Sequence, residues 1–432
     1  MNPRRVVVTG LGQVAPHGRD VVAGFNALLA GQSAITWQAV GDAPHGTALA
    51  SAVCSEGDAA AELGRPRLAT MDRVSQLSAL AALSAWRNAG LGGGPALSGA
   101  APGAHTLSPQ TLDQTCVMWG TGAGGIQTLE RGYRDLFVKG RPRISPLSVV
   151  MGMNNAAAGH LALLLGLGGA CLTYSVACAS SAVALGEAMR RVRWGDCDLA
   201  LAGGAEAALP YGTVKAWQSM QVMAAADAHS APAACQPFDA RRSGLVLGEG
   251  AAALVLESRD HALARGARIY AELAGAGSSC DHQHLSTPDA GGQLRALQAA
   301  LRDAAANAAD VRYVNAHGTA TREGDPAECE ALRRLFGADA ARVAVSATKS
   351  MHGHLMGAAG ALEALVTVMA VHTGHIPPTA HLQQIDPACA GLDHVQGSGR
   401  HGVDVSLALS SSFAFGGSNQ VLVFRRDTGG AA

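Results

Sequence analysis

The chain has 432 residues, of which 48% are hydrophobic and 15% are charged, and its formal net charge is −1. This balance excludes a general nucleic-acid binder, because such a protein needs clustered basic surface to neutralise phosphates. The longest apolar stretch, residues 161–172, is too short to cross a bilayer, so we expect no membrane span. Nine cysteines without regular spacing favour reduced thiols, and therefore a cytoplasmic protein, over a disulfide framework.

Short β-branched runs alternate with alanine-rich stretches along the chain, which is typical of an α/β protein with buried sheets. In the first half we expect a helix over residues 75–90 and strands within residues 4–12, 115–125, 197–209 and 250–258. In the second half we expect strands within residues 268–277, 312–319, 342–350 and 405–417. The repetition predicts an internal duplication, with an N-terminal half over residues 1–260 and a C-terminal half over residues 261–432.

The run TYSVACASSAVALGEA, residues 173–188, places Cys178 between a strand-like segment and an alanine-rich helix. A helix N-terminus offers free backbone N–H groups and the positive end of the macrodipole, which favour a thiolate and can hold an oxyanion. Cys178 is therefore a candidate nucleophile. A free cysteine in an apolar sequence is more often an inert core residue, so the rest of the chain must decide.

Further reactive side chains lie in glycine-rich segments of the second half. The segment NAHGTATREGD carries His317, and TKSMHGHLMGAAGALEAL carries Lys349, His352, His354 and Glu363. Near the C-terminus, SSSFAFGGSN forms a glycine-rich turn after an apolar run. A cysteine, two histidines and a lysine in such contexts make a usable acyl-transfer set.

Four motifs in this order, VACASSA, NAHGTAT, TKSMHGHLMGAAG and SFAFGGSN, resemble the signature of elongating β-ketoacyl-[acyl carrier protein] synthases. The similarity runs from Arg4 almost to the C-terminus. It implies a thiolase-like fold, in which two duplicated halves stack into five αβαβα layers. It also implies that an acyl chain moves to Cys178 and is condensed with malonyl-[acyl carrier protein] with loss of CO2. We expect no metal and no bound cofactor, because the carrier protein delivers its own phosphopantetheine arm.

The resemblance also assigns roles to single residues. The backbone N–H groups of Cys178 and Phe413 would form the oxyanion hole, and the Phe413 ring would gate the acyl pocket. His317 and His354 would donate hydrogen bonds to the thioester carbonyl that becomes an enolate. His352 matches no functional residue.

The same likeness assigns roles to two further pairs of residues. Lys349 and Glu363 would pair as a structural and electrostatic support, because an unpaired buried ammonium is costly. Thr319 and Thr321 match positions that bind the pantetheine arm, although a threonine in a loop can equally bond its own backbone.

Some positions depart from the pattern of housekeeping fatty-acid enzymes. Ala123 stands where a bulkier isoleucine is usual, which predicts a longer acyl pocket. Ser243 stands where an aspartate is common, and Ala414 where a glycine is common. An alternative is therefore the ketosynthase subunit of a specialised type II polyketide or aryl polyene pathway, working with a catalytically inactive chain-length partner.

The expected partners are the carrier protein and either a second copy or a homologous chain-length subunit. Small basic groups could dock an acidic carrier protein or could be ordinary solvated surface; they are Arg65, Arg67, Lys139, Arg141 and Arg143. A degradative thiolase would need a second cysteine near the C-terminal site. The last cysteine, Cys389, lies outside SFAFGGSN. A metal site at Cys280, His282 and His284 lacks a second ligand pair at zinc-like spacing.

Overall fold

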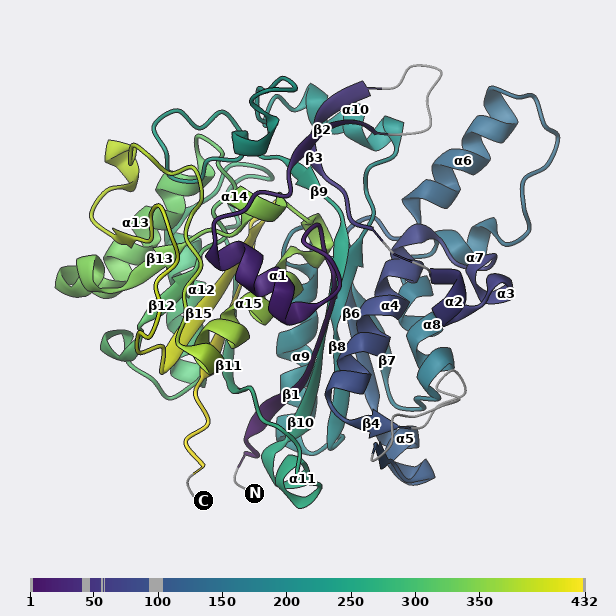
Figure 1. Cartoon of the computed structure of the whole chain (residues 1–432), viewed down its shortest axis with the longest axis horizontal. Coiled ribbons are helices and arrows are strands. Elements are labelled where there is room, and N and C mark those ends of the chain that lie inside the picture. The colour runs from purple at the N-terminus through teal and green to yellow at the C-terminus, as the bar shows by residue number, and fades with distance from the viewer. Residues whose placement is uncertain (1–2, 41–46, 56, 58, 93–103, 430–432) are drawn as a thin grey trace.

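A large mixed sheet forms the centre of the protein in a computed structural model that describes residues 3–40, 47–55, 57, 59–92 and 104–429. Among these residues the sheet has 11 strands in the order β14-β13-β12-β15-β16-β11-β1-β10-β8-β6-β7 (Figure 1). The strands from the first half of the chain are β1 (Val6–Val14), β6 (Cys116–Gly120), β7 (Cys171–Tyr174), β8 (Leu199–Glu206) and β10 (Gly250–Ser258). Those from the second half are β11 (Ala271–Cys280), β12 (Tyr313–Asn315), β13 (Ala344–Ser346), β14 (Asp393–His394), β15 (Leu407–Ala414) and β16 (Ser418–Arg425).

The same strand arrangement occurs twice in this sheet. In β1-β10-β8-β6-β7 the first two pairings are antiparallel and the last two are parallel. The row β11-β16-β15-β12-β13 repeats this order of directions. A short antiparallel pairing of β1 with β11 joins the two rows. The boundary predicted between residues 260 and 261 falls inside helix α11 (Arg259–Ala264) and stays a prediction.

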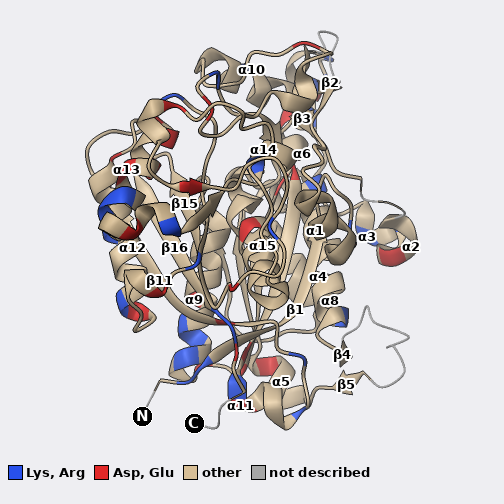
Figure 2. Cartoon of the chain, turned by 60° about the vertical axis from the view of Figure 1, so that its left-hand side comes forward, with Lys and Arg blue, Asp and Glu red and all other residues tan. Residues whose placement is uncertain are grey.

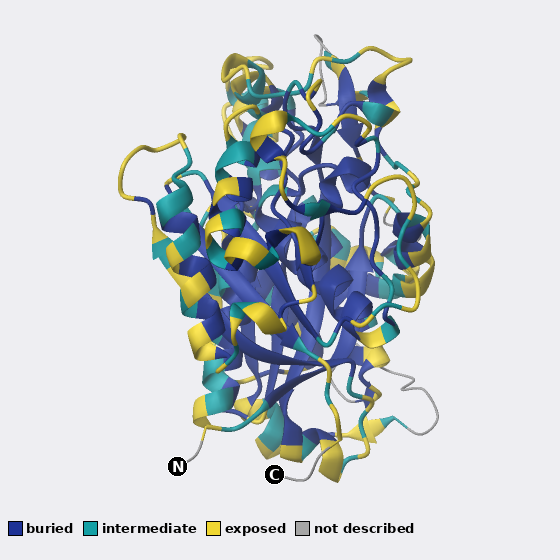
Figure 3. Ribbon diagram, turned by 90° about the vertical axis from the view of Figure 1, so that its left-hand side faces the viewer, coloured by how far each residue is buried: buried dark blue, intermediate teal, exposed yellow. Residues whose placement is uncertain are grey.

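Helices cover and separate the two rows of strands in five layers. The helices α4 (Arg73–Asn88) and α8 (Ala156–Leu165) pack on the outer face of the first row. The helices α12 (Ala290–Asp303) and α13 (Gly324–Phe336) pack on the outer face of the second. Between the rows lie α9 (Ser180–Trp194) and α15 (Ala359–Thr373), whose apolar side chains share one core with both. Figure 3 shows the buried interior in dark blue, with exposed segments in yellow around it.

The burial of these elements follows from their sequences. Strands such as β8 and β10 are buried along their whole length, and they are almost continuous apolar runs because helices cover both faces. The helical stretch Met356–Thr373 is long and apolar enough to cross a membrane, with a mean hydropathy of 1.3, but 89% of it is buried inside the fold. It is therefore the core helix of this fold. Figure 2 shows charged residues mainly on outer helices such as α11, α12 and α13.

The remaining elements lie around this core. The other described helices of regular α type are α1 (Val21–Leu29), α2 (Ala59–Leu63), α3 (Arg65–Leu68), α5 (Pro109–Gln114), α6 (Ile126–Phe137), α7 (Ser148–Gly152), α10 (Tyr211–Ser219) and α14 (Lys349–His352). Smaller sheets contain β2 (Thr36–Val40), β3 (Thr47–Ala52) and β9 (Leu247–Gly248), and β4 (Leu91–Gly92) with β5 (His105–Thr106). The helix expected over residues 75–90 is confirmed as α4, and the strand expected over residues 250–258 is confirmed as β10.

Candidate active site

Cys178 lies in a sharp turn between β7 and α9, two residues before the helix begins. The preceding Ala177 has a φ of 44°, which is uncommon for a residue with a side chain. The Ser180 hydroxyl stabilises the turn, because it accepts the Val176 N–H at 2.8 Å and donates to the Ala177 carbonyl at 2.6 Å. The cysteine is 5% exposed. The strand-to-helix placement expected from the sequence is confirmed.

The expectation that this position favours a thiolate is wrong for the resting protein. Burial raises the pKa of the Cys178 thiol to about 11. The Lys349 charge and a backbone N–H from Phe415 lower that pKa, but they do not offset the loss of water around the sulfur. The sequence predicts that Cys178 lies at a helix N-terminus, but it does not show which distant segments bury the thiol. Cys178 therefore carries its proton until a substrate arrives.

Two histidines face the cysteine from the C-terminal half. His317 follows β12 by two residues, and His354 follows α14 by two residues. Their ring centroids are 5.3 Å apart and their planes are nearly perpendicular, at 84°. One ligand atom from each of Cys178, His317 and His354 lies within 4.8 Å of the others. The structure thus brings together three residues from three separate motifs.

The hydrogen bonds to the two rings define their tautomers. The Lys349 ammonium donates to His317 Nδ1 at 3.1 Å, and the Met356 N–H donates to His354 Nδ1 at 3.3 Å. Both Nδ1 atoms therefore accept, and both Nε2 atoms carry the proton. His354 Nε2 is buried without a hydrogen-bond partner among the described residues. Such an orphaned donor is costly unless a ligand satisfies it.

Both imidazoles are neutral. Burial, followed by the charge of Lys349, lowers the pKa of His317 and of His354 well below the usual value. The site therefore contains two uncharged N–H donors beside a thiol. The same three ligand atoms could hold a metal ion in principle, but the ammonium next to His317 disfavours a cation here.

Lys349 is fully buried and forms an ion pair with Glu363 from α15. Its Nζ also donates to the His317 carbonyl at 2.6 Å. Burial raises the pKa of Glu363 to about 7, against the opposing effect of the Lys349 ammonium. Lys349 thus contacts His317 rather than Cys178. In the same short helix, the Nδ1 atom of His352 bonds the Gly353 carbonyl and its Nε2 atom bonds the Thr348 hydroxyl.

The sequence analysis missed two buried carboxylates that hold the site loops. Glu328 in α13 accepts the backbone N–H groups of His317 and Gly318, each at 2.8 Å. Glu206, at the end of β8, accepts N–H groups from Gly122, Ala123 and Gly357 at 2.7, 3.2 and 3.0 Å. Burial raises the pKa of both carboxyls. An acidic residue that ends an otherwise apolar strand, as in LALAGGAE, was a signal for Glu206.

The backbone donor beside the Cys178 sulfur differs from the expectation, and the gating role of Phe413 stays a prediction. The backbone N–H that reaches the Cys178 sulfur belongs to Phe415, not to Phe413. Phe413 lies inside β15, paired opposite Asn419, and its buried ring points edge-on to His317 with centroids 6.2 Å apart. The strand ends at Ala414, so of the two phenylalanines in this motif Phe415 is the one that lies in the turn. The Phe415 ring stacks on the Trp217 ring, with centroids 5.9 Å apart.

A cavity of about 540 Å³ connects these residues. Its lining includes Cys178, His317, Thr319, Thr321, His354 and Phe413. The hydroxyls of Thr319 and Thr321 lie 3.0 Å apart. Ala123 is not among the lining residues; it is half-buried in the turn that Glu206 holds.

The surface groups named from the sequence lie apart from this cavity or bond locally. Lys139 and Arg141 both pair with Asp135, at 2.8 and 3.0 Å. His284 Nδ1 accepts the N–H groups of Ser286 and Thr287 within its own loop, each at 3.1 Å. These contacts leave the carrier-protein docking role a prediction.

The doubled α/β unit, with a buried cysteine facing two neutral histidines, defines a condensing enzyme of the thiolase-like class. Family profiles described as "Beta-ketoacyl synthase, N-terminal domain" and "Beta-ketoacyl synthase, C-terminal domain" match residues 3–262 and 270–383. The chain therefore belongs to the β-ketoacyl synthase family and is an acyl-transferring condensing enzyme.

Relatives match along nearly the whole chain. Nodulation protein E of Rhizobium sp. is 40% identical over 98% of this chain and 99% of its own length. The 3-oxoacyl-[acyl-carrier-protein] synthase 2 of Vibrio cholerae is 36% identical over 99% of this chain and 100% of its own.

Solved structures confirm the thiolase-like fold. The ishigamide ketosynthase/chain length factor has a TM-score of 0.86 and 30% identity, covering 98% of this chain and 100% of that one. A ketosynthase of a type II polyketide synthase, solved in complex with its acyl-carrier protein, has a TM-score of 0.85 and 28% identity, covering 99% and 100%.

Proposed function

We propose that this chain is a β-ketoacyl-[acyl carrier protein] synthase that uses Cys178 as its nucleophile. The observation that carries the proposal is the convergence of Cys178 with the neutral rings of His317 and His354 within 4.8 Å. A sulfur nucleophile and two uncharged N–H donors meet the needs of acyl transfer and of enolate formation.

In the first stage, the Cys178 sulfur attacks the carbonyl of an acyl thioester carried by the phosphopantetheine arm. A new S–C bond forms, the carrier sulfur leaves, and the proton of the Cys178 thiol passes to the departing thiolate. The carbonyl oxygen gains negative charge during this step, and the backbone N–H groups of Phe415 and Cys178 hold it. The contact between Phe415 and the Cys178 sulfur supports this pair over Phe413.

In the second stage, malonyl-[acyl carrier protein] loses CO2, and the electrons of the broken C–C bond form an enolate on the thioester carbonyl. The Nε2–H groups of His317 and His354 donate to that oxygen, which would satisfy the unpartnered His354 Nε2. The carbanion then attacks the acyl group on Cys178. The C–S bond breaks, the product leaves on the carrier, and the Cys178 thiolate takes a proton from solvent.

Lys349 and Glu363 support these steps without touching the substrate. The Lys349 ammonium holds His317 in the Nε2–H tautomer through its contact with Nδ1 at 3.1 Å. Burial lowers the pKa of both histidines, and the Lys349 charge lowers it further because a second positive charge nearby is unfavourable. Thr319 and Thr321 line the cavity and would hydrogen-bond the amides of the pantetheine arm.

Intact-protein mass spectrometry after incubation with a panel of acyl carrier thioesters tests the proposal. We expect one added acyl group, which is lost in Cys178→Ala and kept in Cys280→Ala, a control at an exposed cysteine. Acylation of the Cys178→Ala protein, or continued formation of the β-ketoacyl product, would overturn it. The same panel reports the preferred chain length.

A specialised polyketide or polyene pathway is a second candidate. The ishigamide ketosynthase/chain length factor, which is 30% identical over 98% of this chain, supports this alternative. Ala123 lies outside the lining of the described cavity, so its small side chain would lengthen the pocket only if the acyl chain reaches beyond that cavity. The variant Ala123→Ile should shift the preference to shorter acyl chains. If the variant accepts the same longest chains, the pocket argument is wrong.

We also propose that the chain works in the cytoplasm as a dimer, with a second copy or a homologous chain-length subunit. Nine cysteines outside disulfides among the described residues fit a reducing compartment. β7 is one of the two edge strands of the described sheet and exposes Cys171 and Leu172, while Leu163 in the adjacent helix α8 is 74% exposed. An uncovered edge strand with apolar neighbours favours pairing. Native mass measurement of the purified complex separates a homodimer from a heterodimer and contradicts both if only a monomer is present.

A further inference from the structure

The loop between β12 and α13 carries His317 and both threonines, but it has no regular secondary structure. Its Ala320 has a φ of 64°, in the left-handed region that glycine usually occupies. Several backbone N–H groups of this loop donate to side-chain carboxylates instead of to the backbone carbonyls of a helix or sheet. Glu328 accepts the N–H groups of His317 and Gly318, and Asp325 accepts the Ala320 N–H at 3.1 Å.

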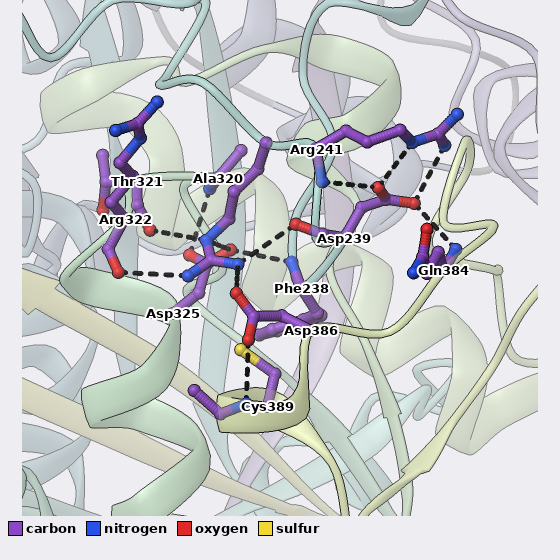
Figure 4. A network of polar contacts seen from close by, with 12 residues as sticks. Phe238, Asp239, Arg241, Ala320, Thr321, Arg322, Asp325, Gln384, Asp386 and Cys389 are labelled. Carbon is purple, nitrogen blue, oxygen red and sulfur yellow. Dashed lines mark hydrogen bonds and ion pairs between the residues drawn. The ribbon is translucent and has the colours of Figure 1, made fainter.

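The carbonyl side of the same loop is held by one guanidinium. Arg242 Nε donates to the Thr321 carbonyl at 3.0 Å, and its Nη2 donates to the Arg322 carbonyl at 3.1 Å. Its Nη1 donates to the Asp386 carboxylate at 2.5 Å. Figure 4 shows Thr321, Arg322, Asp325 and Asp386 gathered in this network.

Burial makes this arrangement specific to arginine. The Arg242 side chain is only 5% exposed, so its charge needs the two carboxylates nearby, Asp386 and Asp325, the latter 3.8 Å from Nε. A planar fork with fixed donors can hold two successive carbonyls at once, which the single ammonium of a lysine does less well. Thr321 and Arg322 also line the cavity that contains Cys178.

We propose that Arg242 is a positioning residue for the pantetheine arm, because it fixes the backbone that carries Thr319 and Thr321 in the lining of the cavity. This inference rests on the proposed function of those threonines. Arg242 touches neither Cys178 nor the two histidines in the contacts described above. Its loss should therefore weaken recognition of the arm more than it slows chemistry at the sulfur.

Two thioesters with the same acyl group separate these effects. One carries the acyl group on the phosphopantetheine arm of a carrier protein, and the other is the S-ethyl thioester, which has no amide to bind. The rate of Cys178 acylation is followed by intact mass for each substrate. For Arg242→Gln we expect kcat/KM with the carrier substrate to fall about tenfold relative to kcat/KM with the ethyl thioester, mostly through KM.

The neighbouring Arg241 provides a matched control. Its described hydrogen bonds all go to Asp239, and its side chain is 49% exposed. Arg241→Gln should leave the ratio of the two kcat/KM values unchanged. Arg242→Lys keeps the positive charge but loses the planar guanidinium with its fixed donors. The ratio of the two kcat/KM values for this variant should therefore lie between those of the wild type and Arg242→Gln.

The outcomes distinguish this inference from the proposed function. If wild-type Cys178 is not acylated by either thioester, the proposed function is wrong. If the wild type is acylated and Arg242→Gln changes both substrates equally, or neither, the positioning role is overturned. If neither Arg242 variant folds, as judged by circular dichroism, the residue stabilises the whole chain and the specific role is also overturned.

Discussion

Lys349 and Glu363 form an ion pair in which neither side chain exposes any surface. Lys349 also reaches His317 through both its ring nitrogen and its carbonyl. One buried cation thus sets the tautomer and holds the backbone of a single histidine, and it adds to the effect of burial in keeping that histidine neutral. Such a pair is stable only while both members are present, because either one alone would be a buried, uncompensated charge.

Removing one member of this pair should destabilise the protein strongly. We expect Lys349→Met to lower the free energy of unfolding by about 3–5 kcal/mol, because it leaves the Glu363 carboxylate without its cation. The double variant Lys349→Met, Glu363→Leu should recover most of this loss. Urea unfolding followed by circular dichroism measures both. A double variant that is as unstable as the single one would show that the pair is not the source of the effect.

The reactivity of Cys178 should increase with pH over an unusually wide range. Only the thiolate is alkylated, and the pKa of about 11 means that its fraction grows about tenfold per pH unit below that value. We expect the iodoacetamide rate at Cys178 to keep rising between about pH 7 and pH 10. Peptide mass spectrometry follows this site beside the exposed Cys171 and Cys280 in one digest. A plateau below about pH 8 would mean that the N-terminus of α9 outweighs burial.

Replacing His354 should separate the two stages of the reaction. His354→Ala removes one donor to the enolate, so the rate of malonyl decarboxylation should fall about 100- to 1,000-fold. Acylation of Cys178 should persist, because the backbone N–H groups that hold its oxyanion remain. Release of labelled CO2 and intact mass measure the two stages. His352→Gln, at a buried histidine two residues away, controls for the cost of changing this core segment. Equal loss of both stages would contradict the separate roles.

We expect acylation of Cys178 to change the fluorescence of Trp217, because the Phe415 ring stacks on this tryptophan. The two rings stack with centroids 5.9 Å apart and 19° between their planes, and such a contact contributes about 0.5–1.5 kcal/mol. If the turn moves to admit an acyl chain, the environment of Trp217 changes. We expect acylation to shift the tryptophan emission of the wild type and of Phe413→Leu.

The same shift should be absent from Phe415→Ala, which keeps the backbone N–H but lacks the ring. Trp217→Phe identifies the part of the signal that comes from this tryptophan. An identical shift in Phe415→Ala and the wild type would show that the Phe415 ring is not the gate.

The sequence by itself determined the family, the α/β class and the three reactive side chains. Cys178, His317 and His354 each lie in a short motif whose residue types and local turn chemistry are readable without a fold. The duplication was also predictable, because each half repeats apolar runs that end in a polar or glycine-rich segment. Local patterns of this kind depend on neighbours in the chain.

Only the tertiary structure decided which groups act on those side chains. Phe413 and Phe415 are two residues apart in one motif, and the end of β15 at Ala414 selects the second as the backbone donor. The roles of Glu206, Glu328 and Arg242 depend on backbone groups that meet them from distant segments. The protonation of Cys178 likewise follows from burial by both halves. Burial and long-range hydrogen bonds come from packing, and no local pattern of residues encodes which distant segments will meet.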